Sequence, residues 1–194
     1  MDVDPIVVKM LRDCLMREGW PASARSLPSD RGGLTRGGIT ARSWGRYMKL
    51  GRDATEMELN AIDEPSALNF YFDEYVRKPR FGEIADARLR ELLVDWAFTS
   101  WSDDPTKALQ RALVKQGKNI GSVDGVIGDL TLAAVNSTTT SATTLYRDVF
   151  TDRVRFYVAL AIGEPAVVAL MKRDPYSQLH NLTGWVNRAL QFAP

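Results

Sequence analysis

Apolar residues recur at helical spacing along most of the chain. The first run, which Gly19 and Pro21 end, comprises Ile6, Val7, Met10, Leu11, Cys14 and Leu15. A second apolar set predicts a helix over 83–99, and a third predicts a helix over about 144–162 that Gly163 ends. The pattern indicates a mainly α protein.

Helix start signals add shorter elements. Thr40 can cap a helix over 41–50, and Asp53 with Glu56 has the spacing of a capping box, for a helix to about 62. A helix starting at Glu64 and Pro65 is expected to reach about 77. A turn over 124–128 leads into a short helix over 129–136, and a last helix contains 184–188.

Glycines recur in the segment between the first two predicted helices. Residues 20–40 hold Pro, polar residues and two Gly-Gly pairs, which predict a loop followed by a short β-hairpin. The expected fold class is therefore mainly α, with one small β-hairpin.

The length of 194 residues fits one domain, or one domain with a closely packed appendage. Ser102–Pro105 is a stop-and-start signal, so we expect a first region over 1–101 and a helical second region over 102–194. A half-sized fragment buries less of its surface, which favours packing of the second region against the first.

Composition excludes several classes of function. The apolar fraction of 45% and charged fraction of 25% are typical of a globular protein, and the net charge of +1 argues against a nucleic-acid partner. No run approaches the ~18 apolar residues of a membrane span, so no membrane insertion is expected. The start of the chain has no secretory signal, so we expect synthesis in the cytosol.

Cysteine and histidine are scarce. Cys14 is the single cysteine and is expected to be a buried, inert thiol, and His180 is the single histidine. Residues 124–129 lack the ligand series of an EF-hand loop. We therefore expect no metal and no cofactor.

Glu18 is the strongest candidate for chemistry. It stands at the end of the first helix, where the negative end of the helix dipole favours a protonated carboxyl, as a general acid requires. Asp30 lies in the glycine loop and could hold a water or stabilise positive charge, and Thr35 could position the same water. The structural alternatives are a solvated Glu18, an Asx-turn for Asp30 and a strand position for Thr35.

Aromatic side chains could stack on sugars. The candidates are Trp20, Trp44, Tyr47 and Trp101. Trp96 and Trp185 stand on apolar helix faces and are expected in the core.

The stretch Arg17-Glu18-Gly19, followed by Asp30-Arg31-Gly32-Gly33-Leu34-Thr35-Arg36-Gly37-Gly38-Ile39-Thr40, resembles the start of glycoside hydrolase family 108. These are phage and prophage N-acetylmuramidases. Trp20 stands where the family usually has a second Gly. The resemblance implies a lysozyme-like fold and Glu18 as the catalytic acid. A looser likeness to other phage lysozymes implies Glu18, Asp30 and Thr35 together.

The second half carries a separate resemblance. The segments 108–113, 123–128, 131–135 and 184–188 resemble the predicted peptidoglycan-binding region that follows the catalytic region in this family. Between the two, Val94-Asp95-Trp96-Ala97-Phe98 resembles the family's Asp-bearing helix. Asp95 could support the cleft from behind, or it could be a structural aspartate.

The function implied is an endolysin-like, bacteriolytic peptidoglycan hydrolase, acting as a monomer on the β-1,4 bond between N-acetylmuramic acid and N-acetylglucosamine. It would reach the cell wall after release or export by other factors. A lytic transglycosylase, which also needs one glutamate, and a non-catalytic wall-binding protein are the alternatives.

Overall fold

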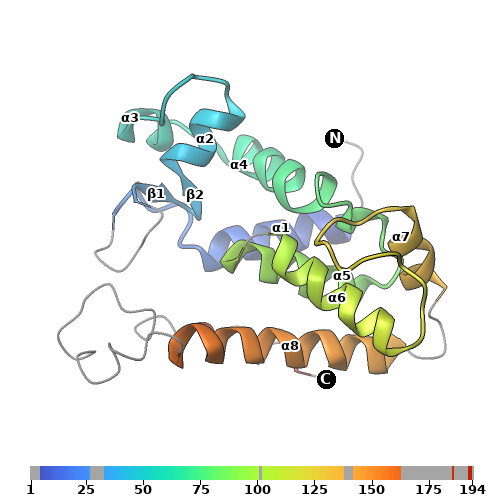
Figure 1. Cartoon of the computed structure of the whole chain (residues 1–194). Coiled ribbons are helices and arrows are strands. Elements are labelled where there is room, and N and C mark those ends of the chain that lie inside the picture. The colour runs from blue at the N-terminus through green and yellow to red at the C-terminus, as the bar shows by residue number, and fades with distance from the viewer. Residues whose placement is uncertain are drawn as a thin grey trace. The chain divides into compact units, whose positions relative to one another are not determined.

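The computed structural model describes residues 5–26, 33–100, 102–137, 142–162, 185 and 192–193. Residues 1–74 and 75–194 form two compact units. The described residues contain eight α-helices and one two-stranded antiparallel hairpin (Figure 1). The prediction of a mainly α fold with one small hairpin is confirmed.

The first unit is built on α1 (Pro5–Arg17), which packs against α4 (Glu64–Tyr71). Five of the six residues of the predicted apolar run are buried, and Ile6 is exposed; the buried residues are Val7, Met10, Leu11, Cys14 and Leu15. Cys14 is buried, as expected, and its sulfur accepts a hydrogen bond from Arg17 Nη2 at 3.0 Å.

The hairpin pairs β1 (Thr35–Arg36) with β2 (Ile39–Thr40). Gly37 and Gly38 form its turn with φ angles of 51° and 75°, which a two-residue hairpin turn with the right twist requires and which glycine adopts without strain. Figure 1 shows that the chain passes directly from β2 into α2 (Ala41–Tyr47).

Two helix caps in this unit test the predicted start signals. The Thr40 side chain accepts a hydrogen bond from Ser43 N at 3.1 Å, so the cap of α2 is confirmed, although α2 ends at Tyr47 rather than at 50. The predicted capping box of Asp53 and Glu56 is wrong. The box lies two residues later, between Thr55 and Glu58, and it starts α3 (Glu56–Asn60), because Glu56 is already the first helical residue.

The helix expected over 64–77 is interrupted. Asp63 caps α4 by accepting from Ser66 N at 2.9 Å, and α4 ends at Tyr71. A π-helical turn, η1 (Phe72–Arg77), follows and spans the boundary between the two units. The expected span is helical throughout, but not as one α-helix.

The second unit is a helical assembly. Its elements are η2 (Phe81–Glu83), α5 (Ala87–Thr99), α6 (Asp103–Lys115), α7 (Asp129–Asn136) and α8 (Ala142–Ile162). The helix α5 contacts α6 and α8, and α6 lies beside α8 (Figure 1). The expected start at 83 was too early, because the 3₁₀ turn η2 and the Asp86 cap come first. The bounds of α7 are those predicted.

The division into 1–101 and 102–194 stays a prediction. The helix α5, which that division assigns to the first region, contacts α6 and α8 of the second. Of the helix expected over 184–188, only Trp185 lies within the described residues. Among the helices described, none has the length and apolar character needed to cross a membrane.

Candidate active site

Glu18 stands immediately after α1, at the C-cap of the helix. Gly19 follows with φ +86°, and its N–H donates to Met16 O at 3.0 Å, while Trp20 N donates to Leu15 O at 3.3 Å. This pair of hydrogen bonds is a Schellman motif, which needs a left-handed residue after the cap and therefore favours glycine. The Glu-Gly pair thus ends the helix and fixes the backbone that carries the carboxyl.

The Gly37–Gly38 turn packs directly on this helix end. A Cβ added at Gly38 would lie 3.0 Å from Glu18 Cγ and 2.8 Å from Tyr71 Oη. One added at Gly37 would lie 2.9 Å from Trp20 Cε3. The hydroxyl of Tyr71, from α4, donates to Gly37 O. The two glycines therefore serve close packing as well as the turn, and they hold the Glu18 side chain against the hairpin.

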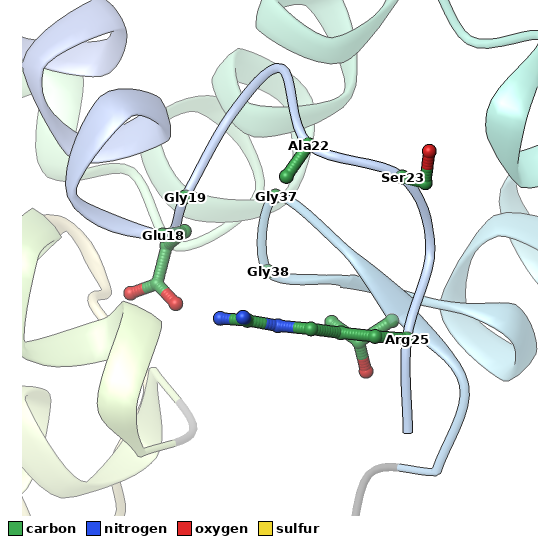
Figure 2. Close-up of a pocket in the computed structure, with 8 residues that line it drawn as sticks. Glu18, Gly19, Ala22, Ser23, Arg25, Gly37 and Gly38 are labelled. Carbon is green, nitrogen blue, oxygen red and sulfur yellow. The ribbon is translucent and has the colours of Figure 1, made fainter. Parts of the chain in front are cut away.

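The half-buried Glu18 side chain lines a pocket with a volume of about 140 Å³. The lining residues are Glu18, Gly19, Ala22, Ser23, Arg25, Thr35, Gly37 and Gly38. Figure 2 shows the Arg25 guanidinium pointing toward the Glu18 carboxylate across this pocket. A carboxyl on a rigid helix end, open to a polar pocket, has the placement of a group that exchanges protons with a bound molecule.

Arg25 was not among the residues expected at the site. It pairs with Thr35 through two main-chain hydrogen bonds, of 2.8 and 2.9 Å, and so extends the hairpin as an isolated bridge. No local sequence signal marks this bridge, because it joins positions ten residues apart across a loop.

Arg36 is the second residue that the sequence did not single out. Its guanidinium donates to five main-chain carbonyls, those of Pro21, Ala22, Leu59, Asn60 and Ile62. It also lies over the Trp20 ring, 4.2 Å from the centroid. Arg36 therefore ties the turn after Glu18 to the end of α3.

Thr35 is at the site and Asp30 lies outside the described residues. The Thr35 hydroxyl donates to Gly33 O at 3.0 Å and keeps its acceptor lone pairs for another partner. The catalytic roles expected for Glu18, Asp30 and Thr35 stay predictions.

The aromatic candidates do not line this pocket. Trp20 and Trp44 are buried, at 9% and 8% exposed. Trp44 stacks on Tyr47 with centroids 5.5 Å apart, and Phe70 meets both rings. Tyr47 is half-buried and donates to Asp73 Oδ2 at 3.0 Å. Trp101 lies outside the described residues, and the sugar-binding role of these side chains stays a prediction.

Trp20 stands where the resembled family usually has a second glycine, and packing explains why a tryptophan fits there. In a Schellman motif the residue after the left-handed position commonly meets an apolar residue at the end of the helix. Trp20 and Leu15 are these two residues, and both contact the backbone at Gly37. Trp20 therefore packs against the end of α1 and stabilises the turn that follows Glu18.

Asp95 lies inside the second unit. Its carboxylate accepts from Arg153 Nη2 at 2.6 Å, and both side chains are fully buried. Arg153 Nε also donates to Tyr157 Oη at 3.2 Å, and that hydroxyl bonds to Thr99 Oγ1. The support of the cleft expected from Asp95 stays a prediction. Trp96, expected in the core, is 1% exposed.

The loop before α7 is organised by Asp124. Its carboxylate accepts from Gln110 Nε2 and from Val126 N, both at 2.9 Å, and from Ser122 Oγ. The Gln110 hydrogen bond, followed by that from Val126, holds the pKa of Asp124 below its ordinary value. Within the described ranges, no group of three or more histidine, cysteine or acidic side chains is arranged to hold a metal.

Comparison with known proteins identifies the class. Residues 11–100 match the glycosyl hydrolase 108 family, and residues 104–190 match a predicted peptidoglycan domain. The first match contains Glu18 and the hairpin that packs on it. A glycosyl hydrolase domain followed by a peptidoglycan domain defines a glycoside hydrolase that acts on peptidoglycan.

The resemblance read from the motifs is confirmed, to the glycosyl hydrolase 108 family over residues 11–100 and to the predicted peptidoglycan domain over residues 104–190. The solved structure of SagA from Brucella abortus is similar in fold, with a TM-score of 0.67 and 24% identity over 96% of this chain and 94% of that one. The lysozyme-like fold is confirmed by this likeness. A comparison with curated proteins finds no match.

Proposed function

We propose that this protein is an N-acetylmuramidase that cleaves the β-1,4 bond between N-acetylmuramic acid and N-acetylglucosamine, with Glu18 as the general acid. The observation that supports this most is the Glu18 carboxyl itself, fixed by the Schellman turn and the Gly37–Gly38 turn and open to a polar pocket. The rigid backbone on both sides of it is what positioned acid catalysis requires.

In the proposed reaction, Glu18 donates its proton to the glycosidic oxygen as the bond from that oxygen to C1 of the muramic acid breaks. Positive charge develops on the ring, water adds to C1, and a carboxylate of the site takes up the proton that the water loses, which gives the reducing sugar. Asp30, with the Thr35 hydroxyl, orients this water or balances the ring charge. A separation of ~6.5–9.5 Å between the two carboxyls gives inversion at C1, and ~5–5.5 Å gives retention.

The test is digestion of purified peptidoglycan followed by mass analysis of the fragments. A muramidase releases fragments with reducing N-acetylmuramic acid ends. Anhydro ends identify a lytic transglycosylase instead, reducing N-acetylglucosamine ends identify cleavage of the other glycosidic bond, and an absence of fragments identifies a wall-binding protein. Addition of the protein to permeabilised bacteria tests the bacteriolytic, endolysin-like role.

Asp30 is tested with Asp30→Ala. We expect a strong loss of turnover, smaller than that of a Glu18 variant, since water placement is partly replaceable. Wild-type turnover in Asp30→Ala would make Asp30 a turn residue.

A further inference from the structure

The pocket beside Glu18 is lined by one positively charged side chain, that of Arg25, to which the proposed reaction gives no role. The Arg25 backbone is fixed by its bridge to Thr35, and its side chain reaches back across the pocket. A side chain at Gly19 would come within 3.7 Å of Arg25 Nη2, so the guanidinium lies close to the backbone beside Glu18.

The N–H groups of the Arg25 guanidinium can donate hydrogen bonds to a ligand. The structure gives it no hydrogen bond or ion pair with a residue that it describes, whereas the neighbouring Arg36 donates to five carbonyls. Arg25 is exposed, so water solvates it until a ligand enters. A guanidinium is always charged, and its planar fork matches a carboxylate bidentately.

We propose that Arg25 binds a carboxylate of the substrate and thereby makes the site selective for glycan strands that carry carboxylates. The proposal rests on the function proposed above. Neutral β-1,4-linked N-acetylglucosamine polymers have the same backbone and no carboxylate. Peptidoglycan has two sources of this group, the lactyl substituent of muramic acid, which is free where the peptide is missing, and the stem peptide.

The pairing is tested by a cycle of two changes, one in the protein and one in the substrate. Arg25→Gln removes the charge, and coupling the peptidoglycan carboxylates to methylamine neutralises the substrate. For the wild type, neutralisation should lower kcat/KM by about 10- to 100-fold, the range of a charge-assisted hydrogen bond. Arg25→Gln should lose a similar factor on native substrate, and neutralisation should then cost it almost nothing more.

Arg42→Gln is the matched control, since Arg42 is an exposed arginine of the same unit that does not line the pocket. It should keep the full response of the wild type to neutralisation. Melting curves of both variants verify that they are folded.

A comparison of peptide-free glycan strands with intact peptidoglycan decides which carboxylate Arg25 binds. Glycan strands stripped of peptide by an amidase carry free lactyl carboxylates only. If these strands show the same cycle, the lactyl group is the ligand, and if only intact peptidoglycan shows it, the stem peptide is.

An equal loss for Arg25→Gln on native and neutralised substrate would overturn the proposal, because it would mean that Arg25 acts on Glu18 alone. Such a result leaves the muramidase assignment standing. If the wild type releases no fragments, the proposed function fails instead. Calorimetric titration with short stripped strands, native and neutralised, then decides the Arg25 pairing through the ratio of the two Kd values.

Discussion

Glu18 and Asp95 are both carboxyls on or next to a helix, but their surroundings differ in burial and in the way each side chain is held. Asp95 is fully buried and bound to a fully buried arginine, Arg153. Glu18 is half-buried, packs its methylenes on Gly38 and opens its carboxyl to a pocket. The comparison teaches that backbone turns and close packing of an apolar stem can place a carboxyl at a pocket, whereas a fully buried carboxyl is fixed by the charge that its oxygens meet.

The largest effect is expected at the open carboxyl. Glu18→Gln keeps the shape of the side chain but has no proton to donate, so cleavage of peptidoglycan should fall by about 10²–10⁴-fold. Fragment release by mass analysis measures the loss, and the melting temperature should stay that of the wild type. If the variant retains most of the activity, Glu18 is not the general acid and has only a structural role, as Asp95 does.

The buried carboxyl should instead affect folding. Asp95→Ala leaves Arg153 charged and unpaired in the interior, at a cost of about 3–5 kcal/mol in the free energy of unfolding. Urea denaturation measures this cost. The double variant Asp95→Leu with Arg153→Met removes both charges and should recover most of the stability. If Asp95→Ala is as stable as the wild type, the pair has no structural role.

The apolar hold on Glu18 is tested at Gly38. Gly38→Ala combines a left-handed backbone, φ +75°, with contacts of 2.8 and 3.0 Å to Tyr71 and Glu18, so we expect a loss of about 1–3 kcal/mol in stability and a fall in kcat of about 10-fold or more. Gly51→Ala is the control, because Gly51 has φ +69° and open space around it. It should lose about 1 kcal/mol and keep its kcat. Equal kcat values for the two variants would show that the contact with Glu18 is immaterial.

The smallest effect is expected at a third carboxyl, the half-buried Glu58 of the capping box. The hydrogen bond from Arg52, followed by that from Thr55 N, lowers the pKa of Glu58 to about 2. A lowered pKa means that the carboxylate contributes stability above pH ~4.5 and that this contribution is lost as the pH falls toward ~2. Glu58→Gln should therefore melt slightly below the wild type at pH 7, with a difference that shrinks over this acid range. Activity at pH 7 should be unchanged, and a difference in melting temperature independent of pH would contradict the assignment.

Much of the framework could be predicted, because it depends on local patterns. The buried face of α1, the bounds of α7, the Gly37–Gly38 turn and the Thr40 cap follow from periodicity and capping chemistry. The misplaced capping box marks the limit of such signals. Asp53 with Glu56 and Thr55 with Glu58 have the same spacing, and only the observed start of α3 decides between them.

The surroundings of Glu18 could be predicted only in part. Glu18 and Thr35 were expected at the site from their motif, and both line the pocket. Arg25 and Arg36 were missed, because the position of Arg25 depends on a bridge across a loop and that of Arg36 on contacts with residues more than twenty positions away. Arg36 reaches carbonyls more than twenty residues away, and an arginine on a short hairpin otherwise suggests a solvated surface position.

The Arg36 anchor has a consequence for how this scaffold tolerates sequence change. All five of its hydrogen-bond acceptors are main-chain carbonyls, and every amino acid supplies one. Replacing the side chains at those five positions leaves the acceptors chemically intact, whereas replacing Arg36 removes every donor at once. The connection between these segments thus depends on the side chain at one position, and a redesign of this protein has more freedom at the anchored positions than at position 36.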